Sequence, residues 1–241
     1  MFYDPVESPF YGLCVEHFIL ASTEYGANGA HIRELGAGTG QSTIDALRRC
    51  DFGGLIHGYE IDQESCAAAS ALIQSHGMGD RYMVHNLDFF AVTPHAEETC
   101  AIANPPYLPA RTSDIQAPEL WGGLDGSDVA RQLMNVGFDR VMLMISSYSN
   151  PISVIDHALR AGYELVDWLA RPIKFGAHSR QAKVYEQIVA LATSGMAFVA
   201  GNHYLLCGTL WAKTGSGGTD RSAMLRHVLS SFHGASADPR S

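Results

Sequence analysis

The feature that most constrains the fold is an alternation of strand-like and helix-like segments that begins near residue 30 and continues to about residue 170. Short apolar stretches predict strands at 30–35, 55–61, 81–87, 100–103, 140–146, 163–170 and 203–212. Stretches with helical patterns or capping residues predict helices at 41–50, 63–77, 125–137, 151–162 and 181–192. Alternating strands and helices build a mostly parallel sheet with helices on both faces. We therefore expect an α/β fold.

The composition is that of a folded globular domain. The chain has 241 residues, of which 46% are hydrophobic and 17% charged, so it can fill one core of ordinary size. No apolar run is long enough to span a bilayer, and the N-terminal stretch MFYDPVESPF lacks a signal-peptide pattern. The five scattered cysteines and eleven histidines form no metal-binding spacing. We expect a cytoplasmic protein with no metal and no membrane partner.

The charge balance bears on the class of partner. The formal net charge is −9, from 25 acidic and 16 basic residues. Nonspecific binding to nucleic acid needs a basic face for the phosphates, so this balance makes a nucleic-acid partner less favoured.

A glycine-rich stretch follows the first expected strand, where open α/β sheets bind ligands. It reads ELGAGTG and comprises Glu34, Gly36, Ala37, Gly38, Thr39 and Gly40. Glycines let the backbone approach a ligand closely. The G-x-G-x-G spacing differs from both a dinucleotide fingerprint and a phosphate-binding P-loop. Glu34 would repel a phosphate but suits an α-amino group, although such a loop by itself can be only a tight turn.

The next two strand ends carry further polar groups. Glu60 and Ile61 end the second strand, and a carboxylate there can accept both hydroxyls of a ribose. Asp88 and Phe89 follow the third strand and suit an adenine amino group and ring. Taken singly, Glu60 can be a solvated acid and Asp88 a turn cap. Together they match an amino acid, a ribose and an adenine without phosphates, which describes S-adenosyl-L-methionine.

The fourth strand ends in Asn104-Pro105-Pro106-Tyr107. The Asn104 side-chain oxygen and the Pro105 carbonyl can accept the N–H groups of an attacking nitrogen and orient its lone pair. The prolines stiffen the turn, and Tyr107 offers a flat face to a planar group. The alternative is that the prolines only end the strand and Tyr107 only packs.

These four motifs, taken in order over residues 31–146, resemble those of class I S-adenosylmethionine-dependent methyltransferases. The resemblance implies a single Rossmann-like domain with a seven-stranded, mostly parallel sheet and an antiparallel last strand. It also implies that Asn104, Pro105, Pro106 and Tyr107 form the catalytic motif and that Asn104 lies at the cofactor as well. The motif NPPY is associated with methylation of amides, exocyclic base amines and some lysines.

The segment after NPPY resembles the short members of the HemK branch, which modify release-factor glutamine or protein lysine. Its glycine turn, 122–126, matches that branch, as do Tyr3, Pro5 and Glu7. Ser8 and Pro9 depart from the branch pattern.

The expected layout has four parts. Residues 1–30 form an N-terminal entry segment and helix, and 31–212 form the methyltransferase domain. An insert at 171–202 serves either as a substrate lid or as an extra helix over the sheet. Residues 213–241 form a flexible Gly/Ser tail with a short helix near 223–232.

Three acceptor classes remain open under this resemblance. A protein glutamine or lysine nitrogen is the leading acceptor. A small-molecule metabolite is the second, with either N-methylation or a non-methyl reaction such as cyclisation. Adenine N6 in nucleic acid is the third, and a non-catalytic binding module is a further alternative.

Overall fold

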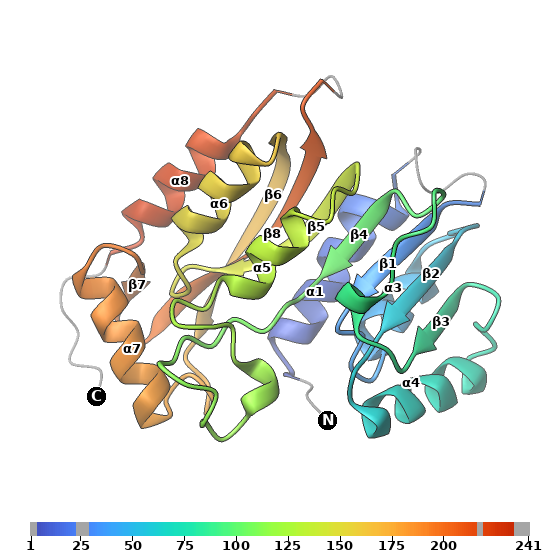
Figure 1. Cartoon of the computed structure of the whole chain (residues 1–241), viewed down its shortest axis with the longest axis horizontal. Helices are drawn as coiled ribbons and strands as arrows, with labels where there is room; N and C mark the ends of the chain where they lie inside the picture. Colours follow the sequence, from blue (N-terminus) through green and yellow to red (C-terminus); the bar gives the residue numbers. More distant parts are fainter. Residues whose placement is uncertain (1–3, 23–28, 216–218, 234–241) are drawn as a thin grey trace. The chain divides into compact units, whose positions relative to one another are not determined.

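The structure, a computed structural model, describes residues 4–22, 29–215 and 219–233. The chain divides into two compact units. The amino-terminal unit comprises residues 1–104 and 138–142, and the carboxyl-terminal unit comprises 105–137 and 143–241. Figure 1 shows the elements of each unit in chain order. Tyr3 of the predicted entry motif lies outside the described residues.

The amino-terminal unit is built on parallel strands in the order β3-β2-β1-β4-β5. Their bounds are β1 His31–Leu35, β2 Leu55–Tyr59, β3 Tyr82–His85, β4 Cys100–Ala103 and β5 Arg140–Ser146, whose last residues continue into the other unit. β1 pairs in parallel with both β2 and β4, and β2 pairs in parallel with β3. Every residue of β4 is buried, which explains its wholly small or apolar sequence.

The helices of this unit begin and end at recognisable signals. They are α1 Glu7–Val15, the π-helix η1 Glu16–Leu20, α3 Gln41–Arg49, α4 Gln63–Ser75 and the 3₁₀ helix η2 Phe89–Ala91. Asp62 caps α4 by accepting a hydrogen bond from the Ser65 amide at 2.8 Å. α1 packs against α3 at Gly12, where a Cβ atom would lie 2.8 Å from the Ser42 carbonyl oxygen. Only glycine permits that approach.

The carboxyl-terminal unit contains the end of β5, with β8 His203–Lys213 between it and β6 Tyr163–Lys174. β6 and β8 are antiparallel along their whole length, with a register shift between Leu165 and Asp167. A two-residue strand, β7 Val199–Ala200, pairs antiparallel with β8. The helical elements are η3 Pro118–Leu120, α5 Asp128–Met134, α6 Pro151–Arg160, α7 Ala182–Thr193 and α8 Ser222–Ser231. Helices α6 and α8 lie side by side along β6 (Figure 1).

The predicted fold class is confirmed: the protein is α/β, with a mostly parallel sheet, an antiparallel last strand and helices packed around it. The observed elements differ from the expected ones in extent, most at α5 and β6. β6 continues past residue 170 to Lys174 because β8 pairs with it as far as His203. α5 begins only at Asp128, because Asp125 and Ser127 hydrogen-bond to each other in a turn before it.

The predicted flexible tail contains a packed helix. Leu225 and Leu229 of α8 are fully buried, and Arg226 pairs with Asp156 of α6. The remainder of the tail at 216–218 and 234–241 lies outside the described residues.

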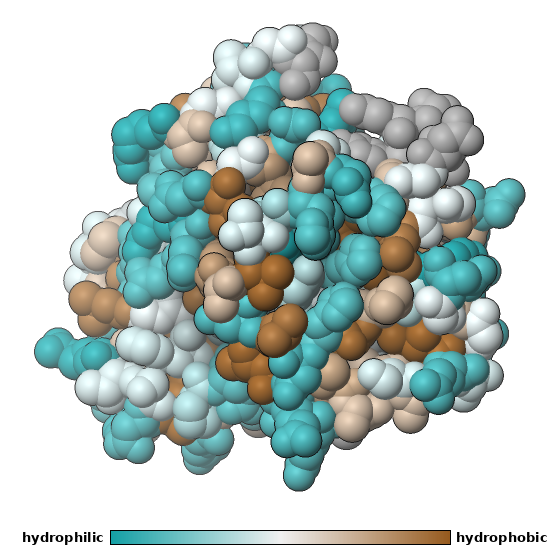
Figure 2. Space-filling model, turned by 45° about the vertical axis from the view of Figure 1, so that its right-hand side comes forward, coloured by the Kyte–Doolittle hydropathy of each residue, from teal (hydrophilic) through white to brown (hydrophobic). Residues whose placement is uncertain are grey.

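At the surface shown in Figure 2, hydrophilic residues predominate and apolar residues form separate groups between them. Within residues 4–22, 29–215 and 219–233, no helix combines the length and apolar character needed to cross a bilayer.

Candidate active site

The register of the parallel strands brings most of the predicted cofactor residues to one edge of the amino-terminal unit. Leu35 of β1 pairs with both Tyr59 and Ala103, and Tyr59 pairs with His85. The residues that immediately follow these four strand ends are Gly36, Glu60, Asn104 and Asn86. Because parallel strands end on the same side, the glycine loop, the acidic strand end and Asn104 lie level with one another.

The glycine loop is tied to the end of β2. The amides of Gly36 and Ala37 both donate to the Tyr59 carbonyl, at 3.0 and 3.2 Å. Gly36, Gly38 and Gly40 have φ angles of +69°, +56° and +71°, a region that favours glycine. A Cβ placed on Gly36 would meet no atom within 4 Å, so the space above this turn is open. Ala37 and Thr39 are half-buried in the same loop.

Glu60 joins the loop to the second strand. One of its carboxylate oxygens accepts from the Gly38 amide and the other from the Asp62 amide, both at 2.8 Å. Each oxygen retains lone-pair capacity for a further donor. The neighbouring Ile61 is 72% exposed.

Asp88 and Phe89 lie in different environments. Asp88 is exposed, and its side chain accepts from the Phe90 amide at 2.9 Å to begin η2. Phe89 is only 3% exposed, with its ring packed against Tyr59 and Phe138. This packing argues against the predicted contact between the Phe89 ring and an adenine. Sequence reasoning overlooked Leu87, which is half exposed next to Asp88.

Glu34 is buried inside the unit. Its carboxylate accepts hydrogen bonds from the hydroxyls of Tyr11, Thr43 and Tyr82 at 2.8, 2.6 and 2.5 Å. Burial raises the pKa of Glu34, while these three hydrogen bonds act in the opposite direction. Most of its accepting capacity is used by these hydroxyls, which argues against the predicted direct contact with an amino group. The carboxylate instead joins α1, α3 and β3 beneath the glycine loop.

Asn104 has an unusual environment. Its side-chain oxygen is buried and has no hydrogen-bond partner among the described residues. A buried acceptor without a donor is costly, and most native proteins avoid it. The cost is explained if a donor from a ligand completes the hydrogen bond.

The remainder of NPPY belongs to the carboxyl-terminal unit, where its backbone is held by two other segments. The Ser149 hydroxyl donates to the Tyr107 carbonyl at 2.7 Å. Leu108 forms a parallel bridge with Trp121, with its amide donating to the Leu120 carbonyl at 2.9 Å. The Tyr107 ring contacts the Tyr148 ring, with centroids 5.9 Å apart. Pro105 is buried and Pro106 is half-buried.

The glycine turn at 122–126 packs directly on the NPPY backbone. A Cβ on Gly122 would lie 2.6 Å from the Pro106 carbonyl oxygen and 2.7 Å from the Tyr107 Cα. Gly126 has a φ of +77°, and its Cβ would lie 2.5 Å from the Tyr107 carbonyl oxygen. Both positions therefore require glycine.

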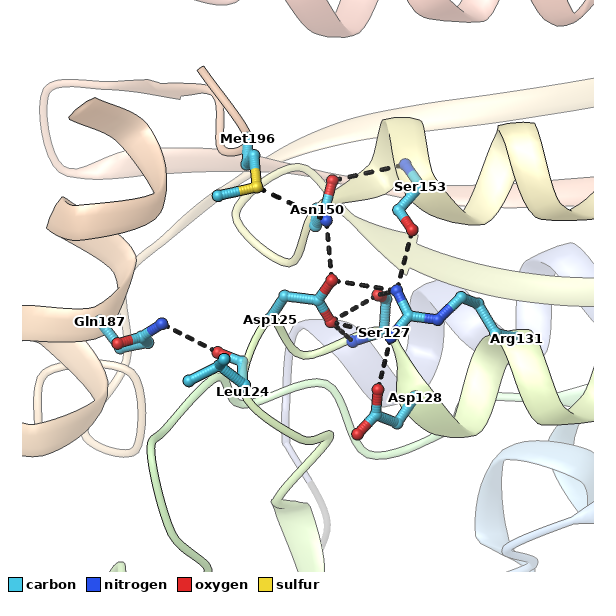
Figure 3. A network of polar contacts seen from close by, with 9 residues as sticks. All are labelled: Leu124, Asp125, Ser127, Asp128, Arg131, Asn150, Ser153, Gln187 and Met196. Carbon is cyan, nitrogen blue, oxygen red and sulfur yellow. Dashed lines mark hydrogen bonds and ion pairs between the residues drawn. The ribbon is translucent and has the colours of Figure 1, made fainter. Parts of the chain in front are cut away.

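A polar network fixes this turn to α5 and α6 (Figure 3). The Asp125 carboxylate accepts from Arg131 at 3.0 Å and from the Asn150 amide at 2.7 Å. Burial raises the pKa of Asp125, but hydrogen bonds from Arg131, Ser127 and Asn150 outweigh it and hold that pKa below its usual value. Sequence reasoning missed Ser149 and Asn150. Their only signal was the polar run SSYSN at 146–150, at the end of an apolar strand.

The predicted insert contacts the segment that follows NPPY. From α7, Lys183 pairs with Asp114 at 2.5 Å, and Gln187 donates to the Leu124 carbonyl at 3.0 Å. Gln181, the residue before α7, accepts from the Gln116 amide at 2.8 Å. The insert therefore packs on residues 114–124, which follow NPPY.

No arrangement of three His, Cys, Asp or Glu side chains suited to a metal ion occurs in the described part of the chain.

Comparisons with known proteins establish the fold. No protein-family model matches the chain, and no curated protein matches it in sequence. Among solved structures, a candidate RNA methyltransferase from Pyrococcus horikoshii is 13% identical, with a TM-score of 0.55 over 88% of this chain and 83% of that one. The [4+2]-cyclase SpnF is 15% identical, with a TM-score of 0.51 over 86% and 82%. TYW2 of M. jannaschii, solved with AdoMet, is 12% identical, with a TM-score of 0.50 over 88% and 78%.

These similarities in structure define the fold of the chain. The chain has the Rossmann-like fold of S-adenosylmethionine-dependent methyltransferases.

Proposed function

We propose that this protein is an S-adenosylmethionine-dependent N-methyltransferase whose acceptor is a protein side-chain nitrogen, either a glutamine amide or a lysine. The observation that carries the proposal is the buried side-chain oxygen of Asn104, which has no hydrogen-bond partner in the described part of the chain and lies level with Gly36 and Glu60 at the carboxyl edge of parallel strands. An oxygen in that position is suited to accept an N–H from a bound nitrogen nucleophile.

The residues at this edge fit the cofactor. When bound, S-adenosylmethionine supplies a sulfonium-activated methyl group. Gly36 leaves open space for the backbone to approach a ligand, and Glu60 has capacity for ribose hydroxyls. Asp88 is exposed and can accept from an adenine amino group, while the exposed Ile61 and Leu87 can cover apolar surface. TYW2, which has a similar fold, was solved with AdoMet.

The role of this chain's own residues is to orient the acceptor nitrogen. The Asn104 side-chain oxygen and the Pro105 carbonyl accept the two N–H groups of the acceptor, so that its lone pair faces the methyl carbon. With the acceptor held in this orientation, the bound cofactor would supply its methyl group to that nitrogen. The nitrogen then releases a proton to solvent. Tyr107 packs against the acceptor group.

The protein acceptor is favoured by the segment that supports NPPY. Gly122 and Gly126 pack on the Pro106 and Tyr107 backbone, so the glycine turn that resembles the HemK branch acts on the motif itself. A second candidate keeps the cofactor but acts on a small molecule. It is favoured by the similarity in fold to SpnF, which is a cyclase.

The test is a label-transfer assay. Purified protein is incubated with methyl-labelled S-adenosylmethionine and, separately, with a release-factor fragment, total cell protein, nucleic acid and a small-molecule extract. Label on glutamine or lysine after digestion would support the proposal. Label only in the small-molecule fraction would favour the second candidate, and label in nucleic acid would favour adenine. Absence of both transfer and cofactor binding would refute the enzyme assignment.

A further inference from the structure

We infer that Arg33, which no motif includes, is the positioning residue for the adenosine side of the proposed cofactor site. It would act by holding the loop at 86–99 between β3 and β4. The inference rests on the proposed function, because it assigns that loop to the base of the cofactor.

Arg33 lies on β1, two residues before the strand ends, and its side chain is fully buried. One guanidinium nitrogen donates to the carbonyls of Phe89 and Val92, both at 3.1 Å. Another pairs with the buried Glu98 at 3.2 Å. The guanidinium carbon also lies 4.2 Å from the centroid of the Tyr59 ring and 4.8 Å from that of Phe89.

These contacts secure both halves of a loop that has little regular structure. Between β3 and β4 the only helical turn is η2, residues 89–91. Arg33 holds the first half through Phe89 and Val92, while Glu98 holds the second half by accepting from the His95 amide at 2.7 Å. Apart from η2, residues 86–99 form no helix or strand, so the buried donors of the Arg33 guanidinium help to define the path of this loop.

The held residues are the immediate neighbours of predicted ligand contacts. Phe89 directly follows Asp88, and Tyr59 directly precedes Glu60. The Tyr59 carbonyl also accepts the amides of Gly36 and Ala37. One buried side chain therefore contacts the residues next to both the adenine and the ribose contacts.

Stability alone gives a weak reason for this arginine. Burying an ion pair costs desolvation that the pairing often fails to repay, and apolar residues of similar volume frequently serve as well. The Arg33 Nε atom has no hydrogen-bond partner in the described residues, which adds to that cost. Placement of the loop explains what the arginine contributes.

The test uses Arg33→Met, which keeps apolar volume, and Arg33→Lys, which keeps the charge but lacks the planar fork. Arg49→Met is the matched control, because Arg49 is half exposed and pairs with Glu16. Binding is measured by calorimetry with S-adenosylhomocysteine and with its inosine analogue, in which an oxo group replaces the adenine amino group. Hydrogen exchange of residues 86–99 is measured without ligand.

We expect both Arg33 variants to exchange faster in this loop and to lose about tenfold or more in affinity for S-adenosylhomocysteine. In both variants, the ratio of the affinity for S-adenosylhomocysteine to that for the inosine analogue should also decrease, because Asp88 would no longer be held in place. A purely structural role would weaken both ligands equally and leave that preference intact.

Two results would overturn the inference: unchanged exchange in the loop, or an unchanged base preference in folded variants. Failure of the wild-type protein to bind S-adenosylhomocysteine would instead refute the proposed function. The exchange measurement would still decide whether Arg33 holds the loop.

Discussion

At the scale of single residues, Asn104 and Glu34 differ in whether their side-chain oxygens have hydrogen-bond donors among the described residues. The side-chain oxygen of the half-buried Asn104 is itself buried and has no donor within residues 4–22, 29–215 and 219–233, whereas the Glu34 carboxylate accepts from three hydroxyls of its own chain. Because buried polar groups are normally hydrogen-bonded, the oxygen left without a described donor favours a ligand role for Asn104, and the three hydrogen bonds favour a structural role for Glu34.

Replacing Asn104 with alanine should separate catalysis from stability. Asn104→Ala removes a buried acceptor for which the described residues provide no donor, so the melting temperature should stay the same or rise slightly. Affinity for S-adenosylhomocysteine should stay near that of wild type, while turnover should fall by about tenfold or more, as for loss of one positioned polar group.

Calorimetry, thermal melting and label transfer together check this prediction. Asn135→Ala is the control, because Asn135 is exposed and its side chain bonds only to His157 among the described residues. Unchanged turnover in Asn104→Ala would contradict the role given to NPPY.

At the scale of elements, the glycine turn at 122–126 depends on Asp125, which accepts from Arg131, Ser127 and Asn150. Asp125→Ala should leave these donors unsatisfied and cost about 1–3 kcal/mol in free energy of unfolding. Turnover should also fall, because the turn supports the NPPY backbone, while cofactor affinity should stay unchanged.

The contribution of Asp125 to the free energy of unfolding depends on pH with a definite sign. The folded-state pKa of Asp125 lies below its usual value of 3.8, so its stabilisation is present above that value. It is lost as pH falls through the folded-state pKa. Urea unfolding of wild type and variant at neutral and acidic pH checks this, and a stability difference that persists undiminished in strong acid would contradict it.

A second element-scale prediction concerns three stacked histidines on β1, β2 and β3. His57 lies between the other two. Its Nδ1 atom is 3.1 Å from Nε2 of His85, and its Nε2 atom is 3.4 Å from Nδ1 of His31. Burial lowers the pKa of His57 below 6.5, as do His85, His31 and Arg33, while Glu98 acts in the opposite direction. Burial also lowers the pKa of His85.

A lowered folded-state pKa means that the folded protein binds fewer protons than the unfolded chain. The stabilisation is therefore present above about pH 6.5 and lost as pH falls through the folded-state pKa. His57→Gln should lose less stability than wild type between about pH 7 and about pH 5. Melting temperatures across that range check this, with the exposed His76→Gln as control. If the melting temperatures of wild type and His57→Gln changed equally with pH, the prediction would be contradicted.

At the scale of the whole molecule, the chain after residue 213 contributes to the fold. Leu229 of α8 is fully buried, whereas Met224 of the same helix is 59% exposed. Leu229→Ala should lower the free energy of unfolding by about 2–5 kcal/mol, while Met224→Ala should change it by about 0.5 kcal/mol or less. Equal effects of the two substitutions, measured by urea unfolding, would show that α8 does not pack as described.

Local patterns in the sequence were sufficient for the fold class and the order of its elements. Strand and helix periods, the prolines of NPPY and the glycines at 36, 38 and 40 act through neighbours in the chain, so they can be recognised without tertiary structure. The same is true of the expectation that Glu60 and Asn104 follow strand ends.

Burial and long-range partners could be decided only by the tertiary structure. The sequence alone could not tell that Phe89 packs in the core, that three distant hydroxyls reach Glu34 or that Arg33 holds the loop after β3. It also could not show that Ser149 donates to the Tyr107 carbonyl across 42 positions of chain. A side chain's type states which bonds it can form, but its three-dimensional neighbours determine which of these it makes and which remain for a ligand.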